Sequence, residues 1–174
     1  MTVYGDLSLG GDEWHAIRLI ATTQVNPQKA VAELIENSID ADAKRIDIIR
    51  EKIGRDLILR IKDDGRGADC CEHEGKVIQS DDIETNLSRI PTHICDSIKR
   101  RLDAASREKI AGEFGIGILG FWSVGVTFVF RSRTAHSDTY VLVMQRDKRD
   151  FTVEKAKEPL DKPGPEVTIK RLGK

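Results

Sequence analysis

The chain has 174 residues, of which 39% are hydrophobic and 33% are charged, and this balance is typical of a globular domain with a buried core. Its formal net charge of -1 excludes a strong overall attraction to nucleic acid or to an anionic membrane. The sequence shows no apolar run long enough to cross a membrane, no secretion signal in residues 1–11, and too few cysteines, at three, for a disulfide framework. These features predict one domain in the cytoplasm.

The apolar pattern switches between helical and strand periods along the chain. Asn26 and Pro27 supply a helix cap and a first-turn proline, and Gly54 stands where a tight turn would join two strands. In chain order, the predicted elements are helices over residues 12–21 and 27–43, strands over 45–51 and 56–62, a polar segment over 68–111, a buried helix over 118–124, and strands over 126–133, 139–146, 151–155 and 166–171.

This order of elements predicts an α/β (α+β) sandwich of two layers. Helices would cover one face of a mixed, mostly antiparallel sheet, because that arrangement buries the apolar face of each element. The polar segment over residues 68–111 is too long and too poor in apolar residues for an ordinary loop. We expect it to be either a mobile lid over a site or partly disordered.

The helical stretch over residues 30–42 carries the strongest chemical signal. One arc holds only acidic and amide side chains, Glu33, Glu36, Asn37 and Asp40, and the opposite side holds Val31, Leu34, Ile35, Ser38 and Ile39. The stretch contains no cation to offset its acids, which favours a metal ion. Asn37 suits Mg²⁺ as an oxygen ligand, and Glu33, one turn earlier, suits the deprotonation of a water. The alternative is a solvent-facing helix side with an accidental acid cluster.

Two glycine motifs follow this helix. Residues 63–67 (Asp-Asp-Gly-Arg-Gly) end a predicted strand, where Asp63 could accept a hydrogen bond from an exocyclic amine and glycines would admit a planar ligand. Residues 112–117 (Gly-Glu-Phe-Gly-Ile-Gly) precede an apolar helix, an arrangement that presents backbone N–H groups to phosphate. Each motif alone is ambiguous, because the first is most often a turn and the second lacks the context of the dinucleotide and P-loop fingerprints.

Together and in this order, the acid and amide helix, the Asp-x-Gly-x-Gly motif, the long insertion and the Gly-x-x-Gly-x-Gly motif resemble the GHKL ATPase superfamily of gyrase B, the ninety-kilodalton heat-shock chaperones, sensor histidine kinases and MutL. Residues 32–41 and 44–48 look nearest to the MutL branch. The resemblance covers residues 25–172 and implies a Bergerat-type ATP-binding fold in one domain over residues 1–174. The lid would be residues 68–111, and transducer and C-terminal domains would belong to a longer protein.

The resemblance assigns a role to each motif. Glu33 would be the general base and Asn37 the Mg²⁺ ligand. Glu36 lies on the side of Glu33 away from Asn37, so its position on the helix predicts a supporting structural role. Asp63 would bind the amino group of adenine. The remaining nucleotide-binding residues would be Asp40, Gly65, Gly67, Gly112, Phe114, Gly115, Ile116, Gly117 and Ile118.

The implied activity is Mg²⁺-dependent binding and slow hydrolysis of ATP to ADP, with lid closure driving conformational change and dimerisation of a larger MutL-like or chaperone-like protein. DNA could bind through further domains, and no membrane contact is expected. Three alternatives remain open, namely a nucleotide-binding module without turnover, an ATPase of the heat-shock-chaperone type, and a histidine kinase.

The last predicted strand departs from the family pattern. In this family it usually begins Gly-Thr, whose hydroxyl supports adenine recognition, whereas the matching pair here is Gly164 and Pro165, with Thr168 as a poorly aligned substitute. A separate structural zinc site is a weaker hypothesis than incidental residues of the lid, because the spacing of the candidate ligands is not that of zinc sites. These candidates are Cys70, Cys71, His73, His93 and Cys95.

Overall fold

The computed structural model describes residues 13–23, 25–74, 76–78, 86–87, 90 and 117–173. The helices are α1 (Glu13–Thr23), α2 (Pro27–Asp40) and α5 (Phe121–Val124), and a 3₁₀ turn, η1 (Gly117–Gly120), runs directly into α5. The strands are β1 (Ile46–Ile53), β2 (Asp56–Asp63), β3 (Cys71–His73), β4 (Lys76–Ile78), β5 (Thr127–Arg133), β6 (Tyr140–Gln145), β7 (Phe151–Lys155) and β8 (Gly164–Lys170). Within the described ranges, every helix is too short or too polar to span a membrane.

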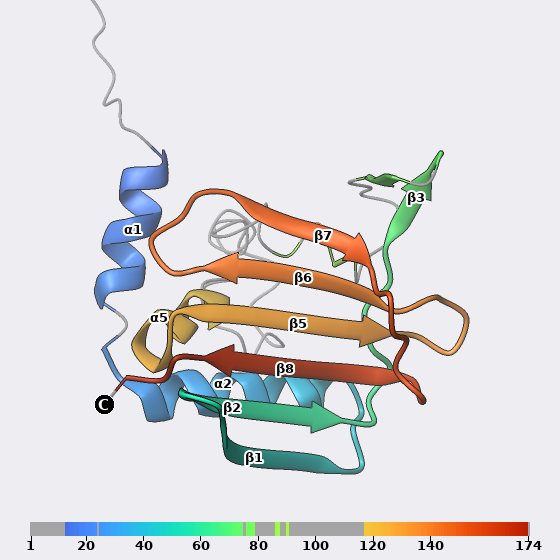
Figure 1. Cartoon of the computed structure of the whole chain (residues 1–174), viewed down its shortest axis with the longest axis horizontal. Helices are drawn as coiled ribbons and strands as arrows, with labels where there is room; N and C mark the ends of the chain where they lie inside the picture. The colour runs from blue at the N-terminus through green and yellow to red at the C-terminus, as the bar shows by residue number, and fades with distance from the viewer. Residues whose placement is uncertain are drawn as a thin grey trace, which may run out of the picture.

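Six of the strands form one sheet in the order β1-β2-β8-β5-β6-β7 (Figure 1). The chain first makes the β1–β2 hairpin and later the β5–β6–β7 meander, and β8 joins them by pairing with both β2 and β5. The prediction of a mostly antiparallel sheet is confirmed, since every pair in the described sheet is antiparallel. The insertion of β8 brings its first residues beside the end of β2.

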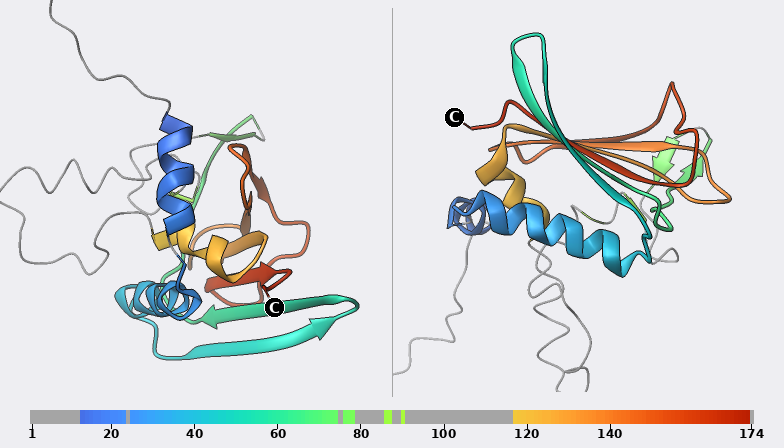
Figure 2. Two further views of the ribbon diagram at one scale, coloured as in Figure 1. Left: turned by 90° about the vertical axis from the view of Figure 1, so that its left-hand side faces the viewer. Right: turned by 90° about the horizontal axis from the view of Figure 1, so that it is seen from below.

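The helices lie against one face of this sheet (Figure 2). Side chains exposed by 2% or less fill the space between the two layers, and they include Leu119, Phe121, Phe128, Leu142 and Ile169. Trp14 of α1 packs edge-on against Trp122 of α5, with ring centroids 6.2 Å apart. The predicted two-layer sandwich is therefore confirmed, and no described helix covers the other face of the sheet.

Helix α2 is set in place by its first residues. The side chain of Asn26 accepts hydrogen bonds from the N–H groups of Gln28 and Lys29, at 2.9 and 3.1 Å, and Pro27 occupies the first turn. The helix ends at Asp40, three residues before the predicted end, because the chain turns at Asp42 with a positive φ of 62°. This turn leads directly into β1.

The polar segment over residues 68–111 is described only in part. It contains the β3–β4 hairpin and a parallel bridge between Asp69 and Asn86. Leu87 is fully buried at 0% exposure and donates its N–H to the carbonyl of Asp69 at 2.8 Å. The segment therefore contributes to the core at this point. The rest of the segment, and with it the choice between a mobile lid and partial disorder, lies outside the described residues.

Candidate functional site

The polar face of α2 carries the predicted catalytic pair. Glu33 is partly buried, and Asn37 is exposed one helical turn further on. Oε1 of Glu33 lies 3.9 Å from Nζ of Lys29, which forms an i,i+4 ion pair with it. The sequence pattern predicts no cation on the acidic face of this helix. That prediction is wrong, because Lys29, which lies just before the stretch over residues 30–42, pairs with Glu33 on this face.

The 3₁₀ turn η1 packs onto α2 at Glu33. A Cβ atom on Gly117 would lie 2.5 Å from Oε2 of Glu33, and one on Gly120 would lie 2.9 Å from Cβ of Ala30. Glycine is needed at Gly120, where a side chain would press on Ala30 of the helix, whereas at Gly117 it leaves room for the carboxylate of Glu33. The structure thus brings Gly117, with Ile118 directly after it, to the carboxylate of Glu33. The other predicted phosphate-binding residues, Gly112, Phe114, Gly115 and Ile116, lie outside the described residues.

The opposite side of α2 faces the sheet. Val31 and Leu34 pack against the core, and Ser38 is buried with 4% exposure. The placement of Ile39 on the buried side is wrong, because its side chain is 59% exposed and lies one residue from the end of the helix. Ser38 is therefore a polar group on an otherwise apolar surface, and such a group needs a hydrogen-bonding partner.

Asp63 is that partner. It is the last residue of β2, and only 8% of it is exposed. Its Oδ2 accepts a hydrogen bond from the hydroxyl of Ser38 at 2.6 Å, and its Oδ1 accepts one from the N–H of Gly65 at 2.9 Å. These donors compensate the carboxylate for the water it loses on burial. The bond to Ser38 joins the end of β2 directly to the helix that carries Glu33 and Asn37.

Arg66 makes a second link between the same two elements. Its backbone N–H donates to the carbonyl of Ala41 at 3.0 Å, and its guanidinium donates to the carbonyl of Asp40 at 2.7 Å and to the carboxylate of Asp42 at 3.1 Å. The last carbonyls of a helix have no partner within it, so Arg66 satisfies two groups that α2 leaves open. Asp40 is thereby held beside the loop that follows Asp63.

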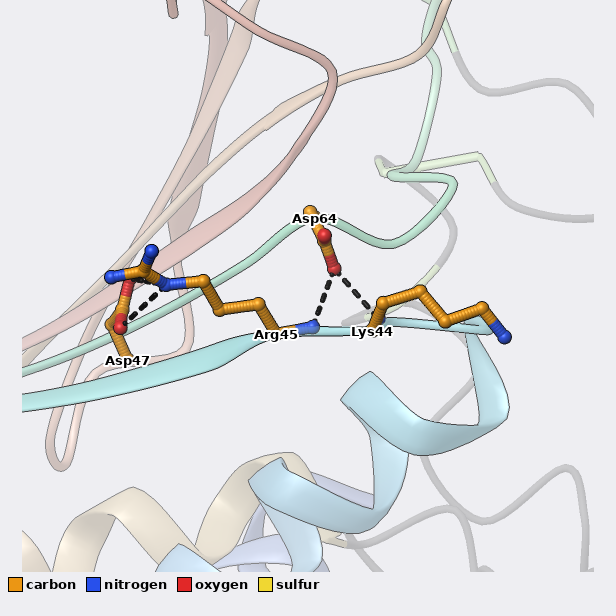
Figure 3. Close-up of polar contacts among 4 residues, drawn as sticks. All are labelled: Lys44, Arg45, Asp47 and Asp64. Carbon is orange, nitrogen blue, oxygen red and sulfur yellow. Dashed lines mark hydrogen bonds and ion pairs between the residues drawn. The ribbon is translucent and has the colours of Figure 1, made fainter.

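Asp64 fixes the other side of this loop (Figure 3). Its Oδ1 accepts hydrogen bonds from the backbone N–H groups of Lys44 and Arg45, at 2.7 and 2.8 Å. The bond from Arg45, followed by the bond from Lys44, lowers the pKa of the Asp64 carboxyl below its ordinary value. The two adjacent acids therefore bind different segments. Asp63, the last residue of β2, binds α2, and Asp64, the residue after it, binds the chain entering β1.

The glycines of this loop meet protein atoms. A Cβ atom on Gly65 would lie 2.9 Å from both the carbonyl oxygen of Ala41 and Oδ1 of Asp63. Gly67 has a positive φ of 70°, and a Cβ there would collide with the carbonyl of Arg133 in β5. Gly164, with a φ of 127°, meets the carbonyl of Asp63 in the same way. Packing between strand ends is thus sufficient to require glycine at these positions, whatever ligand approaches them.

The candidate zinc ligands do not form a site in the described part of the chain. Cys70 is buried, and its Sγ donates a hydrogen bond to Oδ1 of Asn86 at 3.7 Å. The described residues contain no group of three or more His, Cys, Asp or Glu side chains that could hold a metal ion. The side chains of Cys71 and His73 fall outside the description, as do residues 93 and 95.

Sequence reasoning missed several residues that hold the site together, namely Ser38, Asp64, Arg66, Ser132 and Gly164. Ser132 is fully buried in β5, and its hydroxyl accepts the N–H of Ala68 at 2.6 Å. A hydroxyl among apolar positions was a usable signal for Ser38, because such a group must find a partner. The contact of Gly164 depends on the insertion of β8 into the sheet. The contacts of Asp64, Arg66 and Ser132 depend on how the loop after β2 packs against β1, α2 and β5, which sequence periodicity does not reveal.

The sequence comparisons agree with this geometry. Residues 25–172 match the family described as histidine kinase-, DNA gyrase B-, and HSP90-like ATPase. The match covers most of the chain, so the chain belongs to this family. Its antiparallel sheet with helices on one face is the fold expected for the family. It is a GHKL ATPase domain.

Within this family the chain falls in the MutL-like branch. It is 33% identical over 147 residues to the DNA mismatch repair protein MutL of Pseudomonas syringae pv. tomato, a match covering 84% of this chain and 20% of the relative. It is 36% identical over 122 residues to MutL of Pseudomonas fluorescens, covering 70% of this chain and 17% of the relative. The chain therefore spans about a fifth of the length of these relatives.

The close approach of Gly67 to β5 predicts a large loss of stability for Gly67→Ala. This variant combines a positive φ, which costs about 1–2 kcal/mol for a non-glycine residue, with a collision against the backbone of Arg133. Gly54→Ala is the matched control, because Gly54 has a similar φ of 61° and no atom within 4 Å of its Cβ position. Denaturant unfolding should show a clearly larger loss for Gly67→Ala. Equal losses would contradict the predicted packing.

The hydrogen bonds to Asp64 predict a pH-dependent contribution to stability. Because folding lowers the pKa of this carboxyl, its contribution is present above the unfolded value of about 4 and is lost as the pH falls through the folded value. Asp64→Asn should therefore be less stable than the wild type at pH 7, and the difference should shrink at pH 3. Denaturant unfolding at both values measures this, with Asp161→Asn as a control for an exposed acid. A pH-independent difference would contradict the assignment.

Proposed function

We propose that this domain binds ATP together with Mg²⁺ and hydrolyses it slowly to ADP and phosphate. The single observation that carries the proposal is the link between Asp63 and α2, because it places a buried acceptor and the pair Glu33 and Asn37 on one connected frame. Family membership supports the same conclusion. The predicted nucleotide contacts of Gly65, Gly67, Gly117 and the other residues of the two glycine motifs are part of this proposal.

The described residues fit such a ligand. The carboxylate of Asp63 is held in one orientation by two donors and is acceptor-only when ionised, which suits the exocyclic amine of adenine. Asn37 is exposed beside Glu33 and could offer Mg²⁺ one oxygen ligand. A site with few protein ligands is typical of Mg²⁺, which keeps several waters and binds phosphate oxygens.

Glu33 would act as the general base in this reaction. Its carboxylate would take a proton from a water whose oxygen bonds to the γ-phosphorus, while the bond from that phosphorus to the bridging oxygen breaks and ADP leaves. Lys29 forms an ion pair of 3.9 Å with one oxygen of this carboxylate, and the backbone of η1 at Gly117 lies beside the other. Mg²⁺, when bound, would offset the negative charge of the triphosphate.

We further propose that the domain works inside a larger MutL-like protein in the cytoplasm. Residues 68–111 would close over the nucleotide, and closure would drive conformational change and dimerisation. DNA would be contacted through other parts of that protein. This proposal rests on the similarity to MutL proteins, of which the chain spans about a fifth.

The proposed chemistry predicts different outcomes for two conservative substitutions. Glu33→Gln should lower ATP turnover by about 100-fold or more while ATP still binds, because the amide cannot accept the proton. Asp63→Asn should instead weaken ATP binding, because one acceptor oxygen becomes a donor nitrogen. Phosphate release and equilibrium titration of Mg²⁺ and ATP measure the two effects.

Glu36→Gln is the matched control for the general base, because Glu36 is an exposed acid on the same helix. It should retain turnover. Normal hydrolysis by Glu33→Gln would contradict the assigned mechanism. ATP binding without measurable turnover in the wild type would favour the alternative of a nucleotide-binding module.

A further inference from the structure

The hydrogen bond between Ser38 and Asp63 is the shortest polar contact of the carboxylate. Ser38 Oγ lies 2.6 Å from Oδ2 of Asp63 and 3.2 Å from the carbonyl of Leu34. A hydroxyl has one proton, and the shorter bond to a charged acceptor is the stronger of the two. The proton of Ser38 therefore points at Asp63, and the exposed fractions of the two residues, 4% and 8%, keep competing water away.

Ser38 is the only side chain among the described residues that donates to Asp63, since the second donor is the backbone N–H of Gly65. In the register of β2 with β8, Lys62 is paired with Glu166. Continuing this register places Pro165 opposite Asp63, and proline has neither a hydroxyl nor a backbone N–H. The neighbouring strand thus offers the carboxylate no donor at this position.

Thr168 does not replace the missing donor. It is paired with Arg60 of β2 and Val129 of β5, three residues further along β8 than Pro165. Because side chains alternate along a strand, an odd separation places Thr168 on the face of the sheet away from Asp63 and α2. The suggestion that Thr168 substitutes for the family threonine is therefore wrong.

We propose that Ser38 is the positioning residue that makes this site select an amino-substituted purine over one with a carbonyl at the same position. The inference rests on the proposed function. With the proton of Ser38 committed to Asp63, the hydroxyl and the carboxylate present only lone pairs to a ligand. Such a surface accepts a hydrogen bond from an amine, whereas it repels a carbonyl oxygen.

The same bond ties selection of the base to the catalytic helix. Ser38 follows Asn37 directly and lies five residues after Glu33 on α2. A ligand that binds Asp63 is therefore connected, through the bond to Ser38, to the helix that carries Glu33 and Asn37. Loss of the Ser38 hydroxyl would leave the N–H of Gly65 as the remaining described donor to the carboxylate, which would loosen its orientation, and would break this connection. The expected consequence is a change in base preference, which loss of stability alone does not produce.

The test compares binding of ATP and of inosine triphosphate, in which a carbonyl replaces the amino group, by equilibrium titration of the 174-residue chain with Mg²⁺. Ser38→Ala should reduce the preference for ATP by about tenfold, as expected for one hydrogen bond to a charged group. Ser38→Thr should keep most of the preference, because it retains the hydroxyl. Thr168→Val, which removes a hydroxyl of similar burial from the other face, should keep all of it.

Two more variants extend the test, and the first of them guards against failure of Ser38→Ala to fold. Ser38→Cys keeps the shape of the side chain with a weaker donor and should show an intermediate preference. The double variant Ser38→Ala/Pro165→Thr should recover preference, because a hydroxyl would then stand opposite Asp63. An unchanged preference in the folded Ser38→Ala or Ser38→Cys protein would overturn the inference.

Binding of the two nucleotides by the wild type distinguishes failure of this inference from failure of the proposed function. If the wild type binds ATP and inosine triphosphate equally well, the inference is wrong while nucleotide binding stands. If the wild type binds neither, the proposed function itself is wrong. A preference for ATP that falls in Ser38→Ala and returns in Ser38→Thr supports both.

Discussion

The carboxylate of Asp63 is the constraint on which the site depends. Burial of an ionised acid is unfavourable unless donors replace the lost water, and here the hydroxyl of Ser38 and the N–H of Gly65 do so. Both donors must stay in place for the carboxylate to keep its orientation. That requirement fixes the distance between α2 and the end of β2.

The surrounding contacts make this arrangement rigid. Arg66 holds the loop to the end of α2, Asp64 holds it to the chain entering β1, and Gly164 lets β8 approach the backbone of Asp63. These bonds converge on one corner of the sheet from segments far apart in the sequence. The fold therefore holds Asp63, Glu33 and Asn37 in fixed relative positions. The proposed binding and hydrolysis of ATP both depend on this arrangement.

The sequence predicted most of the fold because its signals there are local. Asn26 and Pro27 mark the start of α2, alternation marks the strands, and the motif residues stand close together in the chain. It could not reveal the insertion of β8, because strand pairing at long range leaves no periodic trace. The helical pattern likewise places Ser38 among core positions but does not identify its partner, because Asp63 lies 25 residues further along the chain. Lys29 is different, since it pairs with Glu33 four residues on in the same helix, and this local signal is present in the sequence.

The most direct measurement is a titration of the ¹⁵N-labelled chain with Mg²⁺ and ATP, followed through backbone amide resonances. If ATP binds at Asp63, the amide of Gly65, which donates to that carboxylate, should shift together with amides of α2 around Asn37. Amides of β1, at the edge of the sheet, should shift least. Shifts confined to β1, or none at all, would contradict the site described for this domain.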